Sequence, residues 1–322
     1  MINIAILTGG FSAEISISLK SADVVQKFLD PTKYRSFQIV IDQNGWYERV
    51  SKANIDKNDF SIKVNNEKIN FQAIFVALHG SPAEDGMIQG YFDMLGIPYS
   101  CCNGFVSALT MDKLATKTYL ATAGIFMSKT VSLERNENIN YNSIEELKYP
   151  VFVKPNSVGS SFGVSKVKSR DGLKHAITEA FKHDHIVLIE SFIQGREFGN
   201  GVYQSDGKLI PMPVTEIISE TEFFDFEAKY EGKSKEVTPA NLSDNLTKKC
   251  QDLSLYLYKK LNCSGCVRFD YILQENDFYF LEVNTVPGLS EQSIVPQQAV
   301  HSGLTLTTFF DVLIMDTLKK KC

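Results

Sequence analysis

Two short segments near the C-terminal end, residues 267–271 and 280–285, constrain the fold of this chain more than any other feature. Each alternates apolar and polar residues with period two, which predicts a β-strand with one face on a core and the other turned towards a site. The polar positions hold Arg268, Asp270, Glu282 and Asn284. For one pair alone, solvated charges on amphipathic strands would be the ordinary interpretation. Four such groups on neighbouring strands, followed by Pro287 and Gly288, favour a functional site instead.

The residue types in this pattern indicate which ligand the site would bind. Carboxylate and amide oxygens are ligands that Mg²⁺ accepts, and a Mg²⁺ held by one or two carboxylates usually completes its octahedron with phosphate oxygens. Asp270, Glu282 and Asn284 offer such oxygens. Arg268 suits a phosphoryl or carboxylate oxygen of a substrate. The two segments therefore predict a site for a metal ion and a phosphate group.

The chain is long enough for more than one domain. Its 322 residues exceed the roughly 250–300 at which a single core stops growing, so two or three domains are expected. A charged content of 22% and a net charge of −5 describe an ordinary globular protein without a basic surface for nucleic acid. No apolar run approaches the length of a membrane span, and residues 1–7 lack the length and the basic flank of a signal peptide. We therefore expect a cytoplasmic protein with no membrane or nucleic-acid partner.

The six cysteines do not have the paired spacing of a disulfide scaffold. Cys263 and Cys266 form a single C-x-x-C pattern, with no second pair to complete a zinc site. We expect both to be small buried thiols at the start of a strand.

The first 100 residues alternate strands with helices, which predicts a parallel α/β sheet. The expected strands are residues 2–7, 34–41 and 73–78. The first strand leads through a glycine turn into a helix, an arrangement that can hold an anionic group, although the dinucleotide fingerprint G-x-G-x-x-G is absent. Loops at the carboxyl ends of parallel strands carry the site, so Glu14 and His79 are expected on one rim. For His79, a structural role in its turn is an equal alternative.

The composition changes after residue 100, where we expect the first domain boundary, and a small α+β unit follows it. Its expected elements are a helix from residue 112 to about 124, strands over 149–155, 164–168 and 186–190, and a helix over 171–182. The glycine-serine loop over 156–163 joins two of these strands. A loop rich in backbone amides can fold over phosphates, with Lys154 entering from the strand before it.

The remaining residues, 191–322, form the third expected unit. Its expected elements are strands over 199–203 and 209–216, a helix over 245–261 and a closing helix over 304–318. A long polar and aromatic loop over 222–234 is expected to be a lid, because long loops inside compact domains often close over a site. Its Gly-Lys-Ser ending is not a P-loop, since Glu227 stands where that motif needs glycine.

Several motifs follow one another along the chain in a fixed order. They are G-G-x-S-A-E at 9–14, L-H-G and E-D-G-x-x-Q-G within 78–90, M-D-K at 111–113, V-K-P-x-x-x-G-S-S-x-G at 153–163, E-A-K-Y at 227–230, R-x-D at 268–270 and E-x-N-T-x-P-G at 282–288. In combination they resemble the D-alanine:D-alanine ligases of the ATP-grasp superfamily, from residue 4 to about residue 305. The resemblance implies a three-domain ATP-grasp architecture: an N-terminal parallel α/β domain over 1–100, and two α+β domains over 101–190 and 191–322 that sandwich ATP.

The resemblance also implies roles for individual residues around ATP. Lys113 and Lys154 would lie against the phosphates, Glu190 and Ile193 at the adenine, Glu197 at the ribose, and Lys229, on the lid, at the γ-phosphate. Asp270, Glu282 and Asn284 would be the ligands of Mg²⁺, with two ions expected and Mn²⁺ as an alternative. The alternation of polar and apolar residues on the two strands predicts the same three residues as metal ligands, independently of the family.

The implied reaction is the ATP-dependent ligation of two D-alanine molecules through a D-alanyl phosphate, for peptidoglycan precursor synthesis, by a homodimer formed through the first domain. Glu14 would pair with the ammonium of the first D-alanine and be held by hydrogen bonds with Ser160 and Tyr230. Ser293 would bind the carboxylate of the second D-alanine, and His79 is the other substrate-binding residue. Arg268 and the backbone N–H of Gly288 would stabilise the tetrahedral oxyanion.

The sequence departs from the family pattern at a few positions and leaves two alternatives. The family often has an acid at the position of Ser16, a glycine at Ala83, and tyrosines at Phe224 and Phe226, so two lid hydroxyls are missing. The acceptor could instead be D-lactate or D-serine, but relatives that make depsipeptides generally lack the tyrosine found here as Tyr230. The other alternative is a nucleotide-binding module that has lost catalysis. The presence of Arg268, Asp270, Glu282 and Asn284 argues against it.

Overall fold

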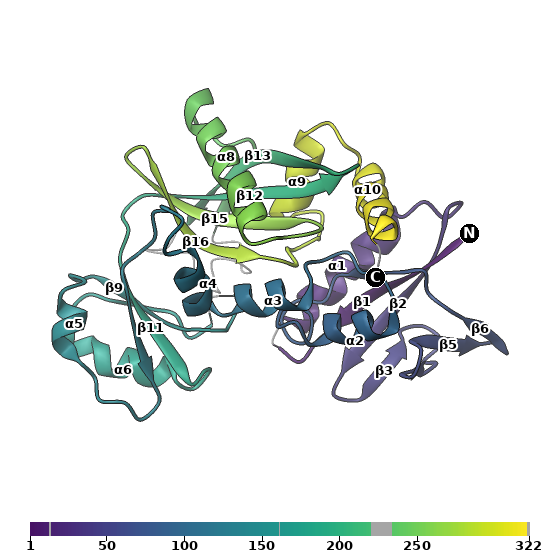
Figure 1. Cartoon of the computed structure of the whole chain (residues 1–322), viewed down its shortest axis with the longest axis horizontal. Coiled ribbons are helices and arrows are strands. Elements are labelled where there is room, and N and C mark those ends of the chain that lie inside the picture. Colours follow the sequence, from purple (N-terminus) through teal and green to yellow (C-terminus); the bar gives the residue numbers. More distant parts are fainter. Residues whose placement is uncertain (13, 161, 220–233, 321–322) are drawn as a thin grey trace.

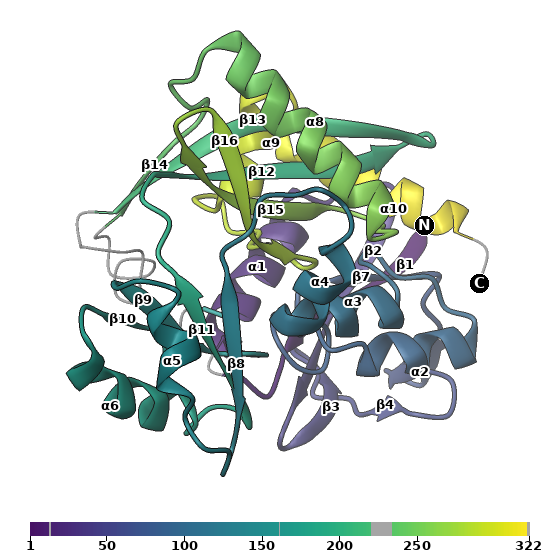
Figure 2. The same ribbon diagram turned by 60° about the vertical axis from the view of Figure 1, so that its left-hand side comes forward.

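The computed structural model describes residues 1–12, 14–160, 162–219 and 234–320. Figure 1 shows three lobes. The N-terminal lobe contains β1 (Ile2–Gly9) and β2 (Tyr34–Asp42), the central lobe contains β9 (Val151–Pro155) and β11 (Ile186–Ser191), and the C-terminal lobe contains β12 (Arg196–Ser205) and β16 (Asp277–Asn284). α3 (Gly104–Met111) lies between the C-terminal lobe and the N-terminal lobe, and α4 (Lys113–Leu120) continues from it towards the central lobe (Figures 1 and 2). The N-terminal and C-terminal lobes thus meet beside the segment that carries the M-D-K motif.

The N-terminal sheet confirms the predicted parallel α/β unit. Its order is β3-β2-β1-β7, with β1 (Ile2–Gly9) parallel to both β2 (Tyr34–Asp42) and β7 (Ala73–Val76). β3 (Gly45–Glu48) adds an antiparallel edge. Ile4 and Ile6 belong to one core and Ala5 and Leu7 to another, so the first strand is buried on both faces. Burial on both faces explains its continuous apolar run.

Besides β3, two parts of the N-terminal lobe are absent from the sequence expectations. One is a small antiparallel sheet of β4 (Ile55–Asp56), β5 (Ser61–Val64) and β6 (Glu67–Ile69), and the other is α2 (Met87–Leu95). The small strands are too short to show a period, and the turn between β5 and β6 depends on Asn65 and Asn66, whose φ angles are 48° and 65°. Asparagine tolerates this left-handed conformation, which suits a tight hairpin turn.

The central lobe contains an antiparallel sheet in the order β10-β9-β11-β8. The predicted hairpin is present: β9 (Val151–Pro155) pairs with β10 (Ser165–Val167), and β11 (Ile186–Ser191) lies on the other side of β9. β8 (Thr130–Glu134) and the short α5 (Tyr141–Glu145) were not expected from the sequence. The predicted helix is α6 (Arg170–Ala180), which buries Leu173, Ala176 and Ile177 in the core of this lobe.

The C-terminal lobe contains a five-stranded antiparallel sheet in the order β14-β13-β12-β15-β16. Its strands are β12 (Arg196–Ser205), β13 (Lys208–Ser219), β14 (Ser234–Val237), β15 (Val267–Gln274) and β16 (Asp277–Asn284). Two helices, α8 (Asp244–Lys260) and α9 (Ile294–His301), pack on the sheet. The predicted lid lies outside the described residues except for Ser234, and so do Lys229 and Tyr230.

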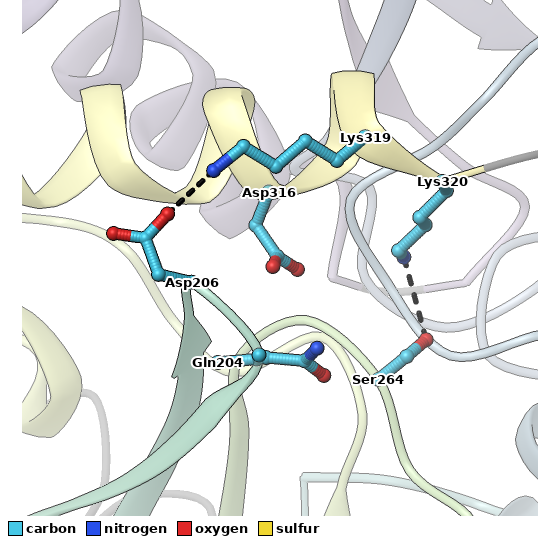
Figure 3. Close-up of a pocket in the computed structure, with 7 residues that line it drawn as sticks. Gln204, Asp206, Ser264, Asp316, Lys319 and Lys320 are labelled. Atoms are coloured by element: carbon cyan, nitrogen blue, oxygen red, sulfur yellow. Dashed lines mark hydrogen bonds and ion pairs between the residues drawn. The ribbon is translucent and has the colours of Figure 1, made fainter.

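The final helix, α10 (Leu306–Lys319), packs on the first sheet of the chain. The rings of Phe310 and Phe75 meet edge to face, with centroids 5.8 Å apart. Figure 3 shows Lys319 paired with Asp206 of the β12–β13 hairpin, and Lys320 directed at Ser264. One core cluster joins Ile4 to Phe310, and another joins Cys102 to Phe198. Core clusters thus cross the boundaries expected near residues 100 and 190, and this division of the chain into three domains stays a prediction.

Other expectations concern the cysteines and the membrane. Cys263 and Cys266 are buried free thiols next to β15, as expected. In the described part of the chain, no helix combines the length and the apolar character that crossing a membrane requires.

The backbone of Gly265, just before β15, lies against the backbone of Ser100 in the N-terminal lobe. A substitution at Gly265 therefore tests how much this contact contributes to stability. Gly265 has φ +72°, and an added Cβ would lie 1.9 Å from the carbonyl oxygen of Ser100. We expect Gly265→Ala to lower the free energy of unfolding by about 2 kcal/mol or more, because left-handed strain and a backbone clash add together. Urea denaturation would measure the loss.

Gly207 provides the matched control for this substitution. It has φ +73° but no atom within 4 Å of an added Cβ. Gly207→Ala should therefore show only the conformational cost of roughly 1 kcal/mol. Equal losses in the two variants would contradict the importance of the contact with Ser100.

Candidate active site

The pairing of β15 with β16 brings together the four polar residues predicted from the strand phases. Arg268 lies opposite Asn284, and Asp270 lies opposite Glu282. Residues opposite each other or two apart on paired strands share one face of a sheet. The register shifts between Asp270 and Tyr271, so that Tyr271 and Phe280 pair within the core beyond this polar set. The predicted convergence of these four side chains is confirmed.

Asp270 is the centre of this polar set. Arg268 donates to both of its carboxylate oxygens, Nε to Oδ1 and Nη2 to Oδ2, each over 2.8 Å, and Asn284 Nδ2 donates to Oδ2 over 2.9 Å. Burial alone would lower the pKa of the Arg268 guanidinium, but the carboxylate of Asp270 outweighs burial and raises that pKa. The guanidinium is thus permanently charged and held in one orientation by a bidentate pair.

The same face fits a bound magnesium ion. Among the described residues there is no group of three or more His, Cys, Asp and Glu side chains that could hold a metal. The expected ligands are instead the two carboxylates of Asp270 and Glu282 and the amide oxygen of Asn284. The Nδ2 of the same Asn284 amide donates to Asp270. Such a partial set suits Mg²⁺, which retains positions for phosphate oxygens and water. Lys113 Nζ lies 3.9 Å from Glu282 Oε2, so a cation from α4 borders this face.

Glu14 and Ser160 meet across two lobes. Glu14 is the N-cap residue of α1 (Ile15–Phe28), and the Ser160 hydroxyl, from the glycine-serine loop, donates to Glu14 Oε1. The loop reaches Glu14 with Ser160 in the left-handed region, at φ 53°. The hydrogen bond expected between Glu14 and Ser160 is therefore present, whereas the one expected with Tyr230 lies outside the described residues.

His79 links the first sheet to the segment that contains Gly288. Its Nδ1 lies 2.9 Å from the Val286 carbonyl oxygen and its Nε2 lies 3.0 Å from Ser21 Oγ. Burial lowers the pKa of His79 despite the opposing effect of Glu14, so the ring is neutral. Nδ1–H then donates to Val286 and Nε2 accepts from Ser21, whose Oγ accepts from the Leu289 N–H. Both ring nitrogens are committed to the protein, which favours a positioning role over direct substrate contact.

A cavity of about 290 Å³ lies between these groups. The predicted site residues that line it are Glu14, His79, Lys113, Ser160, Arg268, Glu282, Asn284, Gly288 and Ser293. Residues from all three lobes therefore surround one space. Asp270 adjoins it through its hydrogen bonds with Arg268 and Asn284.

Gly288 and Ser293 form one end of this cavity. An added Cβ at Gly288 would lie 2.9 Å from Ser293 Oγ, so a side chain at position 288 would crowd the hydroxyl. Ser293 precedes α9, and its hydroxyl shares a hydrogen bond of 2.7 Å with the hydroxyl of Ser290. Hydroxyls and a helix N-terminus together suit a carboxylate.

The other predicted nucleotide residues in the described part of the chain lie outside the lining of this cavity. Lys154 Nζ, from β9, lies 2.8 Å from Glu190 Oε2, on the neighbouring strand β11. Burial alone would raise the pKa of Glu190, but the ammonium groups of Lys154 and Lys117 outweigh it and lower the pKa to about 2. Ile193 follows β11 and Glu197 lies on β12, and both are half-buried.

Sequence reasoning did not assign a role to Lys117 or Glu84. Lys117 follows Lys113 by one helical turn on α4 and pairs with Glu190. Glu84 lines the cavity and accepts a 2.7 Å hydrogen bond from the Gly80 N–H. Burial, reinforced by Glu14, raises the pKa of Glu84 to about 8. In the sequence, Glu84 could have been found from the E-D-G motif that it begins, and Lys117 from its spacing of four residues after Lys113.

The arrangement can be compared with known proteins. Residues 3–102 match the family described as D-ala D-ala ligase N-terminus, and residues 119–315 match D-ala D-ala ligase C-terminus. The chain is 46% identical to a D-alanine–D-alanine ligase of Flavobacterium johnsoniae, over 96% of this chain and 97% of that protein. It is 41% identical to one of Bacteroides fragilis, over 94% and 95%.

Solved structures give the same result. The VanG D-Ala:D-Ser ligase of Enterococcus faecalis has a TM-score of 0.88 and 33% identity, covering 98% of this chain and 99% of that one. A D-alanyl-alanine synthetase A of Vibrio cholerae has a TM-score of 0.88 and 27% identity, covering 99% of both chains. Matches of this extent confirm the fold and the resemblance inferred from the motifs: the chain belongs to the D-alanine–D-alanine ligase family and has its ATP-grasp architecture.

Proposed function

We propose that this chain joins two D-alanine molecules into D-alanyl-D-alanine, converts ATP to ADP and phosphate, and supplies a peptidoglycan precursor. The observation that carries this proposal is the cavity that places Glu14, Arg268 and Ser293 around one space. It offers an acceptor for an ammonium, a donor for an oxyanion and a place for a carboxylate. The requirement for ATP also supports a cytoplasmic location.

The first D-alanine would lie with its ammonium against Glu14. Ser160 holds that carboxylate through its hydroxyl, and Glu84 adds a second carboxyl beside it. The carboxylate of this D-alanine would face Lys113 and Arg268, which offset its charge. It would then attack the γ-phosphoryl group of ATP to give D-alanyl phosphate and ADP.

The phosphoryl transfer depends on positive charge around the triphosphate. Lys113 and Lys154 supply two ammonium groups from the protein, and Asp270, Glu282 and Asn284 would hold the divalent cation, which we propose to be Mg²⁺ with two ions. When bound, the cation would neutralise phosphate charge so that a carboxylate can approach the phosphoryl group. Glu190, Ile193 and Glu197 would border the nucleoside. Lys229, on the proposed lid, would reach the γ-phosphate.

The second D-alanine would place its carboxylate at Ser293 and its deprotonated amine at the carbonyl of the acyl phosphate. Attack creates a tetrahedral oxyanion, which Arg268 and the backbone N–H of Gly288 would stabilise. Loss of one such donor commonly lowers kcat by about 10²-fold or more. Phosphate then leaves and the dipeptide remains. Tyr230 would help to close the lid, because an acyl phosphate must be kept from water.

The acceptor can be tested directly with the purified protein, ATP and Mg²⁺ at pH 7. With D-alanine, D-serine and D-lactate in competition, we expect D-alanyl-D-alanine as the main product, with one ADP and one phosphate released per bond formed. Mass spectrometry would identify the products. A predominant D-alanyl-D-serine or D-alanyl-D-lactate product would overturn the choice of acceptor, and the absence of ADP release that depends on D-alanine would indicate an inactive module.

The proposed metal ligands predict the effect of Glu282→Gln. Removing one carboxylate should raise the Mg²⁺ concentration needed for half-maximal turnover by about tenfold or more, because Mg²⁺ then has one charged ligand fewer. The fold should remain intact, since Glu282 is half-buried at the end of β16. A Mg²⁺ titration of initial rates measures the change.

Glu275→Gln is the control, because Glu275 is exposed in the turn of the same hairpin. Its Mg²⁺ dependence should match that of the unmodified protein. If Glu282→Gln showed the same Mg²⁺ dependence as this control, the assignment of Glu282 as a metal ligand would be wrong.

We further propose a homodimer through the first domain, supported by an exposed apolar face. Met87 and Met94, seven residues apart on α2, are 61% and 82% exposed. Met94→Glu should shift the protein to the monomer in sedimentation velocity, because burying a charge opposes association. Val50→Glu, at a residue 86% exposed elsewhere in that lobe, should leave the association state unchanged. A monomeric unmodified protein would refute the dimer.

A further inference from the structure

Lys117 is a buried lysine whose donors are all used inside the protein. Its side chain is only 9% exposed. Nζ donates to Ser128 Oγ over 2.6 Å, to Thr130 Oγ1 over 2.7 Å and to Glu190 Oε1. A lysine ammonium carries three donors and no acceptor. Lys117 therefore cannot contact a nucleotide without losing one of these bonds.

Glu190 is shared by two lysines. Its side chain is 6% exposed, with Lys117 at Oε1 and Lys154 at Oε2. Two ammonium groups and one carboxylate leave this cluster with a formal charge of +1. Interactions between charges are stronger in a buried place than in water, so this surplus acts on any anion that approaches Lys154.

Without Lys117, Glu190 and Lys154 would form a neutral pair, and the carboxylate of Glu190 would hold Lys154 against β11. We propose that Lys117 is a positioning residue that neutralises Glu190, so that Lys154 presents net positive charge to the phosphates of ATP. This inference rests on the proposed contact between Lys154 and the triphosphate, and it extends the proposed function to a residue that never touches the nucleotide.

A purely structural role is the alternative. Lys117 also joins α4 to β8 through Thr130 and to the preceding segment through Ser128. If that were its entire contribution, its replacement would weaken the binding of adenosine, ADP and ATP alike. A contribution through charge instead grows with the charge of the ligand.

The experiment measures Kd for ATP, ADP and adenosine by calorimetry at low ionic strength with the full chain. Lys117→Gln retains an amide donor but loses the charge. We expect it to raise Kd for ATP by about tenfold or more, Kd for ADP by less, and Kd for adenosine by less than about twofold. Lys117→Arg should restore ATP affinity to within about threefold of the unmodified protein, because the charge remains.

The double variant Lys117→Gln with Glu190→Gln separates the two explanations. It removes the carboxylate together with the ammonium, so Lys154 regains a net charge of +1. Because Glu190 is also proposed to border the adenine, the recovery is read from the ratio of the Kd for adenosine to the Kd for ATP, which should return to within about threefold of its value in the unmodified protein. A structural role predicts a further loss instead. Lys320→Gln is the matched control, because Lys320 is likewise a lysine whose Nζ donates inside the protein, to the carbonyl oxygens of Tyr99 and Cys101, but it does not line the cavity.

The outcomes are distinct. Equal weakening for all three ligands, or no recovery in the double variant, overturns the proposal. Thermal unfolding of each variant checks that it is folded. Where Lys117→Gln does not fold, Glu190→Gln alone tests the charge: it raises the formal charge of the cluster to +2, so the ratio of the Kd for adenosine to the Kd for ATP should rise above that of the unmodified protein, and an unchanged ratio overturns the proposal. Lys154→Met tests the underlying proposal separately: unchanged ATP affinity in that variant would show that Lys154 does not bind phosphates, whatever Lys117 does.

Discussion

The buried pair of Arg268 and Asp270 is the interaction on which the site depends. Taking two charges out of water is costly, and the cost is offset only when the geometry is good and the remaining groups are hydrogen-bonded. Here both carboxylate oxygens accept from the guanidinium, and Asn284 donates to one of them from the opposite strand. The pair thus fixes the direction of the guanidinium and, through Asn284, the face shared by β15 and β16.

The N-terminal lobe contributes to the same space through a chain of hydrogen bonds. Ser21 accepts from the Leu289 amide and donates to His79, which donates to the Val286 carbonyl. The turn that contains Gly288 is therefore held at both ends by the first lobe, while Ser160 brings the central lobe to Glu14. No lobe forms the site alone, which explains why the cavity lies where they meet.

The sequence was sufficient for the parts of the site that depend on local pattern. Strand period placed Arg268, Asp270, Glu282 and Asn284 on one face, and the register confirmed it. It was insufficient for Lys117, whose partner Glu190 is 73 residues away, so that only tertiary pairing reveals their contact. The small sheet of β4 to β6 was missed for a different reason, because strands of two to four residues are too short for a period to be read.

The packing of α10 has a consequence for the order in which the chain can fold. Phe309 and Phe310 of this helix share a core with Ile4 and Ile6 of β1, at opposite ends of the sequence. During synthesis, the apolar side of the first sheet therefore lacks part of its cover until residues 306–319 have left the ribosome. The lobe that is made first is completed last, and its exposed side must be kept from aggregation in the meantime.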